Sequence, residues 1–370
     1  MSNSSELSLA FAVLFTALTV SPAVAQTPAQ RPEHALPAPQ PDQTLDLRIP
    51  SAVDGVALAT TVYLPAGSGP FPVIIVAHGA NAASRNRPGW RTHLGAIIDA
   101  GIAIAVADPR GTGDTPGEWV EGGPLDAAAQ DISAIADHLA AHPRIRHDRI
   151  GIWGASRGGW TGPMAAAGNP RIRFVAVVSA PSVSPNAQNI HQRGQELTDE
   201  GYSTEDVDEI NAFRRVVWDY YGTGQNYEAA REVWRTASKR PWFSRIGLTR
   251  PEPIPPDQIM TPSFQYYREG AYNPMPVLSA LRTPILVILG GGDRHIPVDA
   301  CYSGWRAAFA ASGNPDATIV MFNRAGHAMR IYDGLEPMSA VHGHGALAAG
   351  VPHPGYMPTL VAWLRRQVND

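Results

Sequence analysis

Short apolar runs alternate with longer amphipathic segments along most of the chain. Residues 72–77, 102–107, 149–153 and 173–179 are almost wholly apolar. Continuous apolar runs of this length are typical of strands in a parallel sheet, because such strands are buried on both faces. Residues 125–141 instead repeat apolar side chains every three or four positions, which predicts a helix. The alternation predicts an α/β fold, with a mostly parallel central sheet and helices on both of its faces.

The same rhythm is interrupted once, between residues 185 and 276. This segment is polar and aromatic, and its apolar residues keep helical spacing, for example in residues 205–221. Strand-like and helical segments then resume toward the end of the chain, with strands expected at 285–289 and 318–322. We therefore predict an α/β core formed by residues 45–184 and 277–370, with residues 185–276 as a helical cap insertion over the edge of the sheet.

The first 44 residues differ in pattern from the rest. Leu7–Val20 is an apolar run that is short for a membrane span, and Ala23–Ala25 form an A-x-A cleavage signal. These features predict a signal peptide over residues 1–25, followed by a Pro-rich disordered spacer over residues 26–44. The start of the chain carries Glu6 and no Lys or Arg, so an uncleaved anchor helix is the alternative. We expect an exported protein, periplasmic or secreted, whose mature chain does not insert stably into a membrane.

The composition and charge of the chain indicate which kinds of molecule it could bind. The chain has 370 residues, of which 44% are hydrophobic and 17% charged, and its formal net charge is −4. No basic stripe or block of like charge is present, which argues against a nucleic-acid partner. Cys301 is the only cysteine, so no intramolecular disulfide can form, and we expect it to be a packed side chain.

A G-x-S-x-G motif follows the apolar run at residues 149–153. Gly154, Ser156 and Gly158 occupy its fixed positions, and an Ala-rich helical segment comes next. A serine on a tight strand–turn–helix elbow needs small residues two positions away on each side, because the backbone there approaches itself closely. The elbow also places Ser156 at a helix N-terminus, where amide N–H groups stabilise negative charge. An N-cap serine in an ordinary Gly-rich loop is the alternative interpretation.

Two further residues complete the pattern of a serine nucleophile with its base and acid. Asp293 follows the strand predicted at 285–289, and His327 follows the strand predicted at 318–322. In this fold the chain order is serine, then acid, then histidine, and each residue lies just beyond a strand. We predict that Ser156, Asp293 and His327 meet at the carboxyl edge of the sheet, where open α/β sheets bind their ligands.

Other residues of the same types compete for these roles. Asp299 begins a predicted helix and fits an N-cap, while His295 precedes that helix instead of following the last strand. His342, His344 and His353 lie close together near the end of the chain, but their spacings match no zinc pattern. We therefore predict no metal site, and the proposed chemistry requires no cofactor.

An oxyanion hole needs two backbone N–H donors. One comes from Arg157, the residue after the nucleophile. The other should come from the loop after the strand at 72–77, where Gly79 allows the backbone to turn, and we assign it to Ala80.

A substrate pocket is expected between this edge of the sheet and the cap. Asn81 and Trp160 lie in or beside the predicted loops, and Trp218 and Tyr221 belong to the aromatic residues of the cap. These four residues are candidates for the pocket lining. Each cap aromatic could equally pack the cap together, and packing is the favoured interpretation for each one singly.

These motifs resemble those of bacterial exported carboxylesterases of the dienelactone-hydrolase-like and prolyl-oligopeptidase-like group, within the α/β-hydrolase superfamily. The resemblance covers roughly residues 45–368 and implies the catalytic and oxyanion roles given above. The chain departs from dienelactone hydrolases in having Ser156 where they have cysteine. It departs from the dipeptidyl peptidases of this fold in having Arg157 where they carry tyrosine, and it has no propeller repeats. The resemblance rests on HGAN, DPRGTGD, GIWGASRGGW, GGGDRHIP and AGH.

The expected function is that of a serine hydrolase that cleaves a small-molecule carboxylic ester through an acyl-enzyme intermediate. Peptidase or amidase activity and acyl thioesterase activity are alternatives with the same chemistry. A non-catalytic binding protein on the hydrolase fold is the alternative from another class. The physiological ester and the oligomeric state are left open by the sequence.

Overall fold

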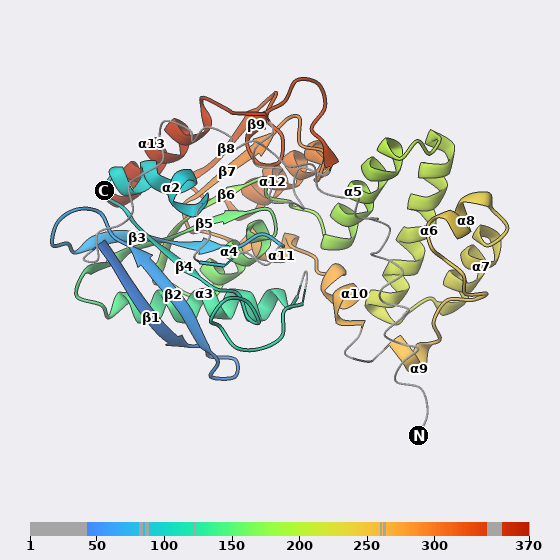
Figure 1. The fold of residues 1–370 in the computed structure, drawn as a ribbon, viewed down its shortest axis with the longest axis horizontal. Helices are drawn as coiled ribbons and strands as arrows, with labels where there is room; N and C mark the ends of the chain where they lie inside the picture. Colours follow the sequence, from blue (N-terminus) through green and yellow to red (C-terminus); the bar gives the residue numbers. More distant parts are fainter. Residues whose placement is uncertain are drawn as a thin grey trace, which may run out of the picture.

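In the computed structural model, a sheet of eight strands organises the larger part of the molecule (Figure 1). The structure describes residues 43–80, 84–85, 89–120, 123–259, 261, 264–338 and 350–369. The predicted signal peptide and nearly all of the predicted spacer lie outside these residues. The strands are β1 (Thr44–Pro50), β2 (Ala57–Tyr63), β3 (Phe71–Ala77), β4 (Ala103–Ala107), β5 (Ile145–Ala155), β6 (Ile172–Val178), β7 (Ile285–Gly290) and β8 (Ala317–Phe322).

The strand order is β1-β2-β4-β3-β5-β6-β7-β8. Only β2 runs against its neighbours, since it pairs antiparallel with both β1 and β4, and every other pairing in the sheet is parallel. The predicted fold class is therefore confirmed. The chain leaves β3 toward β4 on one side and reaches β5 on the other, so the carboxyl ends of β3 and β5 form a topological switch point, where such sheets bind ligands.

Helices cover both faces of the sheet. Along β3, Val73 and Ile75 contribute to one hydrophobic cluster while Ile74 and Val76 contribute to the other, as the alternation of side chains along a strand requires. Helices α3, α4 and α12 pack on the first face, and α2 and α13 pack on the second. Their bounds are α2 (Gly89–Asp99), α3 (Leu125–Ala140), α4 (Gly158–Gly168), α12 (Val298–Ser312) and α13 (Tyr356–Asn369).

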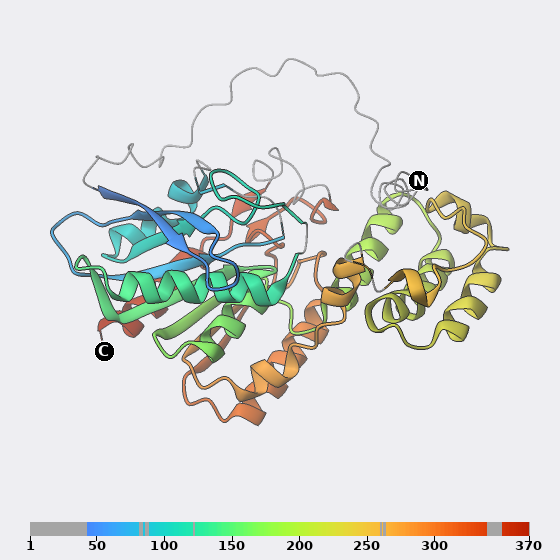
Figure 2. The ribbon, with the colours of Figure 1, turned by 90° about the horizontal axis from the view of Figure 1, so that it is seen from below.

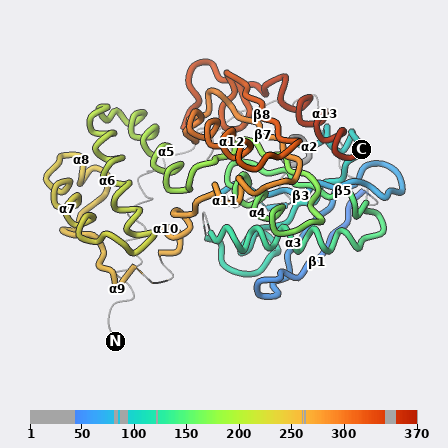
Figure 3. Tube along the Cα trace, turned by 180° about the vertical axis from the view of Figure 1, so that it is seen from behind, coloured from blue at the N-terminus to red at the C-terminus, as the bar shows by residue number. Residues whose placement is uncertain are grey.

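The segment between β6 and β7 forms a helical lobe beside the sheet (Figure 1). Figures 2 and 3 show this lobe on one side of the sheet from two further directions. The lobe has a hydrophobic cluster of its own, rich in aromatic side chains. The last helix of the segment, α11, instead joins the core of the sheet through Leu278. The helices are α5 (Pro185–Asp199), α6 (Thr204–Thr223), α7 (Tyr227–Ala237), α8 (Pro241–Arg245), α9 (Pro256–Ile259), α10 (Gln265–Gly270) and α11 (Met275–Ala280).

One strand of the sheet was not among the predicted elements. In β1, Leu45, Leu47 and Ile49 alternate with polar residues and pack on the core, while β1 pairs along its whole length with β2. A second, two-stranded sheet joins β9 (Arg330–Ile331) to β10 (Val351–Pro352). Within the described part of the chain, no helix is both long and apolar enough to cross a membrane.

Candidate active site

The G-x-S-x-G motif forms a sharp elbow between β5 and α4. Ser156 has φ = +53°, a left-handed conformation that non-glycine residues rarely adopt. A Cβ atom on Gly154 would lie 2.6 Å from the Gly158 carbonyl oxygen, and one on Gly158 would lie 2.3 Å from the Ala77 carbonyl oxygen. Both contacts are closer than real Cβ atoms allow, so the turn that carries Ser156 can form only with glycine at these two positions.

Asp293 and His327 lie in the loops that follow β7 and β8. Their side chains are in contact, with 2.8 Å between His327 Nδ1 and Asp293 Oδ2. Both residues are buried, at 6% and 9% exposed. The other carboxylate oxygen, Oδ1, accepts hydrogen bonds from the backbone N–H groups of His295 (2.8 Å) and Ile296 (3.3 Å). Asp293 is thereby fixed to hold Nδ1–H of the imidazole, an arrangement that leaves Nε2 as the proton acceptor.

The charge of Asp293 sets the proton affinity of His327. Burial alone would lower the pKa of His327, but the charge and hydrogen bond of Asp293, together with the charge of Glu336, raise it above the ordinary value. An imidazole whose protonated form is stabilised in this way is suited to accept a proton from a hydroxyl during a reaction.

Hydrogen bonds connect the serine elbow to the histidine loop through the end of β6. The backbone N–H of Ser156 donates to the Val178 carbonyl at 2.9 Å. The next residue along, Ser179, donates its hydroxyl to the His327 carbonyl at 2.7 Å. Ser156, Asp293 and His327 therefore lie at one edge of the sheet, on loops that are tied to one another.

Other candidate residues have different surroundings. His295 is buried with its ring centroid 5.0 Å from that of His327, and Asp299 is exposed in the first turn of α12. Cys301 is buried, and burial raises the pKa of its thiol to about 12, which suits the predicted packing role. His353 packs on the Phe322 ring with centroids 4.3 Å apart.

The possibility of a metal site can be checked in the described residues. Among them, no group of three or more His, Cys, Asp or Glu side chains is arranged to hold a metal ion. His342 and His344 lie outside the described part of the chain.

A small cavity of about 70 Å³ lies over the elbow, between α4 and the lobe helices α5 and α10. The two predicted oxyanion donors, Ala80 and Arg157, both line it. Trp160 lines it as well, and its Nε1–H donates to the Val183 carbonyl at 2.9 Å. Asn81 lies outside the described residues. The full lining is Ala80, Leu125, Arg157, Trp160, Pro185, Gln188, Asn189, Tyr266, Glu269 and Gly270.

Two charged side chains face this cavity. Arg157 donates from Nη2 to the carbonyls of Gly123 (2.8 Å) and Pro124 (3.3 Å), and burial lowers the pKa of its guanidinium to about 10. Glu269 comes from α10 and accepts the backbone N–H of Leu125 at 3.1 Å. The cavity therefore carries a partly buried cation and an acid beside the elbow.

The two cap aromatics predicted as pocket candidates lie elsewhere. Trp218 packs edge-on against Tyr267 with ring centroids 6.1 Å apart, inside the aromatic cluster of the lobe. The Tyr221 hydroxyl accepts the Ile254 backbone N–H at 3.2 Å, and its ring belongs to the same cluster. Neither side chain is part of the cavity lining, because the lobe buries both of them in its own interior.

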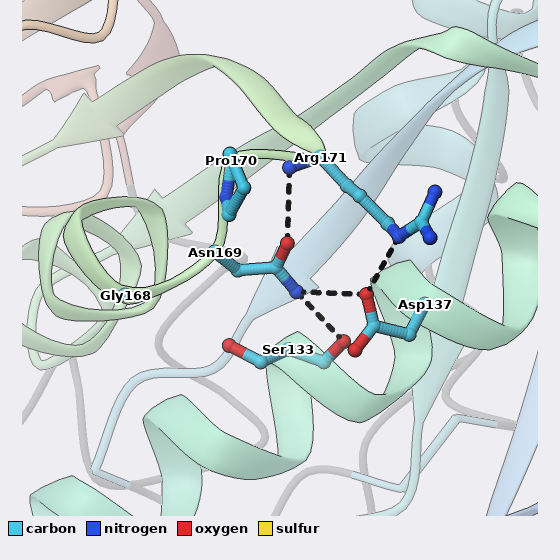
Figure 4. A pocket seen from close by; sticks show the side chains of 6 residues that line it. All are labelled: Ser133, Asp137, Gly168, Asn169, Pro170 and Arg171. Atoms are coloured by element: carbon cyan, nitrogen blue, oxygen red, sulfur yellow. Dashed lines mark hydrogen bonds and ion pairs between the residues drawn. The ribbon is translucent and has the colours of Figure 1, made fainter.

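A second, more open pocket lies at the far end of α4 from Ser156 (Figure 4). Its polar groups satisfy one another: the Asn169 amide donates to the Ser133 carbonyl (3.2 Å) and to Asp137 (3.1 Å), which also pairs with Arg171 (3.1 Å). These contacts tie the segment that follows α4 to helix α3. Because Asn169, Asp137 and Arg171 are engaged with one another, we assign the group a structural role.

Sequence reasoning did not single out Ser179 or Glu336. Glu336 is 2% exposed, and its carboxylate accepts the backbone N–H of His327 at 2.8 Å. Its position in a loop beyond β8 carries no periodic or motif signal, since the contact depends on how that loop folds back. Only the three-dimensional structure reveals it.

Comparison with known proteins identifies the family to which the chain belongs. An uncharacterised 31.7 kDa protein of Escherichia coli is 26% identical over 248 residues, which are 66% of this chain and 79% of that protein. The thiohydrolase aneE of Aspergillus aculeatus is 29% identical over 126 residues, 34% of this chain, and the matched part is 38% of the thiohydrolase. Among solved structures, an esterase of Pyrococcus furiosus aligns with a TM-score of 0.55 at 14% identity, covering 90% of this chain and 97% of that one.

The likeness to this solved structure confirms the predicted α/β-hydrolase fold. The sequence profile of the X-Pro dipeptidyl-peptidase (S15) family matches residues 54–327, a range that includes the elbow, the lobe, Asp293 and His327. The sequence motifs alone indicate a different group of α/β-hydrolases, that of the carboxylesterases. The chain belongs to the X-Pro dipeptidyl-peptidase (S15) family of α/β-hydrolases, and it is a hydrolase.

Proposed function

We propose that this hydrolase cleaves carboxylic esters, with Ser156 as nucleophile, His327 as base and Asp293 as the acid that orients the base. The observation that carries the proposal is the buried hydrogen bond between Asp293 and His327, at the sheet edge that also holds the Ser156 elbow. A serine hydroxyl needs such a base, and the base needs a partner that fixes its tautomer.

The reaction proceeds in two steps. Ser156 Oγ attacks the ester carbonyl while Nε2 of His327 takes the hydroxyl proton, and the leaving alcohol then departs with that proton. Water next attacks the acyl-enzyme, giving one proton to His327, and the carboxylic acid leaves as Ser156 regains its hydrogen. Asp293 stabilises the imidazolium present between the transfers.

The negative oxygen of each tetrahedral intermediate requires two N–H donors. The amides of Ala80 and Arg157 are assigned to this role, and their residues line the same cavity. The start of α4 adds a favourable dipole, because unpaired amide N–H groups point out of a helix N-terminus.

The cavity supports a substrate with a short acyl group. Its volume is about 70 Å³, and it is closed on the lobe side by residues of α5 and α10. The cap aromatics Trp218 and Tyr221 are excluded from this lining, so chain-length preference is assigned to Trp160 and its neighbours in the cavity.

Peptidase activity is the second candidate, because the family match points to X-Pro dipeptides. Glu269 supports it as well, since a carboxylate in the cavity offers a partner for a substrate amine. The same cavity also holds the guanidinium of Arg157, and its positive charge would repel the amine of a peptide substrate.

A substrate panel separates the two candidates. Wild type and Ser156→Ala are assayed with p-nitrophenyl esters from acetate to decanoate and with X-Pro p-nitroanilides, each rate divided by its rate in buffer. We expect the larger enhancement on short esters, with no enhancement by Ser156→Ala. A larger enhancement on X-Pro anilides would replace the esterase assignment with the peptidase one.

Export of the protein is a further part of this proposal. It rests on the apolar run Leu7–Val20 followed by Ala23–Ala25. Expression of the full chain in a bacterial host, followed by intact-mass measurement of the extracytoplasmic fraction, should give a chain that begins at Gln26. Recovery of the exported protein with Met1 retained would contradict cleavage.

A further inference from the structure

A second buried carboxylate lies beside the Asp293–His327 pair. Glu336 bridges the two loops: Oε1 accepts the backbone N–H of His327 at 2.8 Å, and Oε2 accepts the backbone N–H of Arg294 at 3.2 Å. Arg294 directly follows Asp293 in the chain. One side chain therefore fixes the backbone of the histidine and the backbone next to the acid.

The loop before His327 is shaped to admit this carboxylate. A Cβ atom on Gly326 would lie 2.5 Å from Glu336 Oε1 and 2.8 Å from the ring of Tyr332. The Gly326 N–H donates to the Arg330 carbonyl at 2.8 Å, which closes the loop around the site. The space that glycine leaves here is occupied by the acid.

The hydrogen bonds of Glu336 favour its ionised form. Both oxygens accept backbone N–H groups, and a protonated carboxyl would lose one acceptor. Burial and the charge of Asp293 oppose this and raise the pKa of Glu336, while His327 and the two N–H groups act in the other direction. The bridge between the two loops therefore uses the carboxylate form, in which each oxygen accepts one backbone N–H group.

The charged and titratable neighbours of this group come from several elements. His327 faces Asp293, Glu336 and the ring of His295. Glu336 also faces the phenol of Tyr332, whose pKa burial and this carboxylate raise.

Two further neighbours complete this environment. The guanidinium of Arg294 is engaged elsewhere, with Asp199 and the Glu336 backbone carbonyl. His191 of α5 faces Asp293, and burial lowers the pKa of its imidazole.

We propose that Glu336 is a positioning residue for the Asp293–His327 pair, which holds the two loops in register and adds a second negative charge beside the imidazole. The inference rests on the proposed function, because it assigns Glu336 a part in the work of that base. Nothing in this role brings Glu336 into contact with substrate.

Two consequences follow for the reaction. Removing the charge of Glu336 leaves the imidazolium less stabilised, so the pKa of His327 in the free enzyme falls. Because His327 must be neutral to accept the Ser156 proton, the acidic limb of the kcat/KM profile then moves to lower pH. Loss of the backbone bridge separately lowers kcat, since small displacements of catalytic groups are costly.

The test compares three variants of the full chain on a short p-nitrophenyl ester between pH 5 and 9. Glu336→Gln removes the charge, Glu336→Asp keeps the charge on a shorter side chain, and Asp333→Asn removes an exposed charge from the same loop as a control. Melting by circular dichroism shows that each variant is folded.

We expect Glu336→Gln to move the acidic limb down by roughly one pH unit and to lower kcat on the order of ten- to a hundred-fold. Glu336→Asp should lower kcat while leaving the limb near its wild-type pH. Asp333→Asn should match wild type in both. If Glu336→Gln does not fold, the test rests on Glu336→Asp: a lowered kcat with an unshifted acidic limb supports the positioning role, and a wild-type kcat contradicts it.

The outcomes separate this inference from the proposed function. If Ser156→Ala is inactive but both Glu336 variants match Asp333→Asn in kcat and in the limb, the positioning role is wrong and the esterase proposal stands. A change in melting temperature alone also contradicts the positioning role. If Ser156→Ala retains activity, the proposed function itself fails, whatever the Glu336 variants do.

Discussion

The backbone of Ser156 is held in a conformation that its neighbours enforce. A non-glycine residue at φ = +53° costs on the order of 1 kcal/mol or more, and the surrounding turn must supply that free energy. The N–H of Ser156 bonded to Val178 and the Gly159 N–H bonded to the Ser156 carbonyl (2.7 Å) provide it. A strained residue retained at the end of a central strand is typical of a functional site.

Gly158 makes the elbow possible, so its replacement should be costly. In Gly158→Ala the new methyl group meets the Ala77 carbonyl oxygen, and we expect a loss of about 1–3 kcal/mol in the free energy of unfolding, with activity lost beyond that. Urea denaturation and ester hydrolysis measure the two effects. Gly168→Ala, at the other end of α4 with nothing within 4 Å, is the matched control and should change neither. Equal behaviour of the two variants would refute the crowding argument.

Asp293 should matter for catalysis far more than for folding. In Asp293→Asn the amide cannot hold His327 in the tautomer that accepts a proton, and we expect kcat to fall by about four orders of magnitude. Asp299→Asn, an exposed acid in the first turn of α12, is the control and should stay within a few-fold of wild type. A comparable loss of kcat in Asp299→Asn would show that Asp293 is not the acid that orients His327.

The pH profile of the wild-type enzyme follows from the same contact. Asp293 raises the pKa of His327, and only the neutral imidazole acts as base, so kcat/KM should rise with pH and level off above a midpoint higher than 6.5. A pH series at low substrate concentration measures this midpoint. A midpoint well below 6.5 would show that Asp293 does not stabilise the imidazolium.

At the scale of elements, helix α5 connects the lobe to the loop that carries Asp293. Gln188 donates to the His295 carbonyl at 2.7 Å, and Arg294 pairs with Asp199 at 2.7 Å and with Gln195 at 3.2 Å. Residues of α5 thus hold the loop that carries Asp293 by hydrogen bonds and an ion pair. The position of the lobe and the geometry of the acid are coupled through this one helix.

The lobe itself is held by aromatic packing. Trp242 is 2% exposed, packs on Phe213 with ring centroids 5.8 Å apart, and donates Nε1–H to Glu209 at 2.9 Å. Trp242→Ala should cost about 3–5 kcal/mol in the free energy of unfolding, because it leaves a cavity in the lobe and removes the hydrogen bond to Glu209. Leu335→Ala, at a side chain 76% exposed, should cost under about 0.5 kcal/mol.

The same pair of variants tests the assignment of the pocket. If Trp242 only packs the lobe, the folded variant keeps the wild-type order of preference among ester chain lengths. A changed order with unchanged stability would mean that the aromatic cluster contacts substrate.

At the scale of the whole molecule, the hydrophobic pattern predicted most of the sheet. Strands β3, β4 and β7 are apolar throughout and β6 is apolar except for Arg173, so their sequences fit a buried strand better than any other element. Strand β1 was missed because it lies at the sheet edge directly after a Pro-rich segment, where its short alternation of Leu45, Leu47 and Ile49 is the only signal.

The candidate site was predictable to a different degree. Asp293 and His327 could be chosen because each follows a strand, and the fold brings strand ends together at one edge. The lobe side of the cavity lining could not be chosen, since it depends on which faces of α5 and α10 turn toward α4. Glu336 lacked any signal for the same reason, because its partners are set by tertiary contacts alone.

The central claim is that Ser156 is an activated nucleophile. Incubation of the full chain with a fluorophosphonate, followed by peptide mass spectrometry, tests it directly. We predict a single adduct on Ser156 in the wild type, with labelling slowed by at least a hundredfold in His327→Ala, because the base no longer activates the hydroxyl. An adduct on another serine, or none on Ser156 in the folded wild-type protein, would contradict the claim.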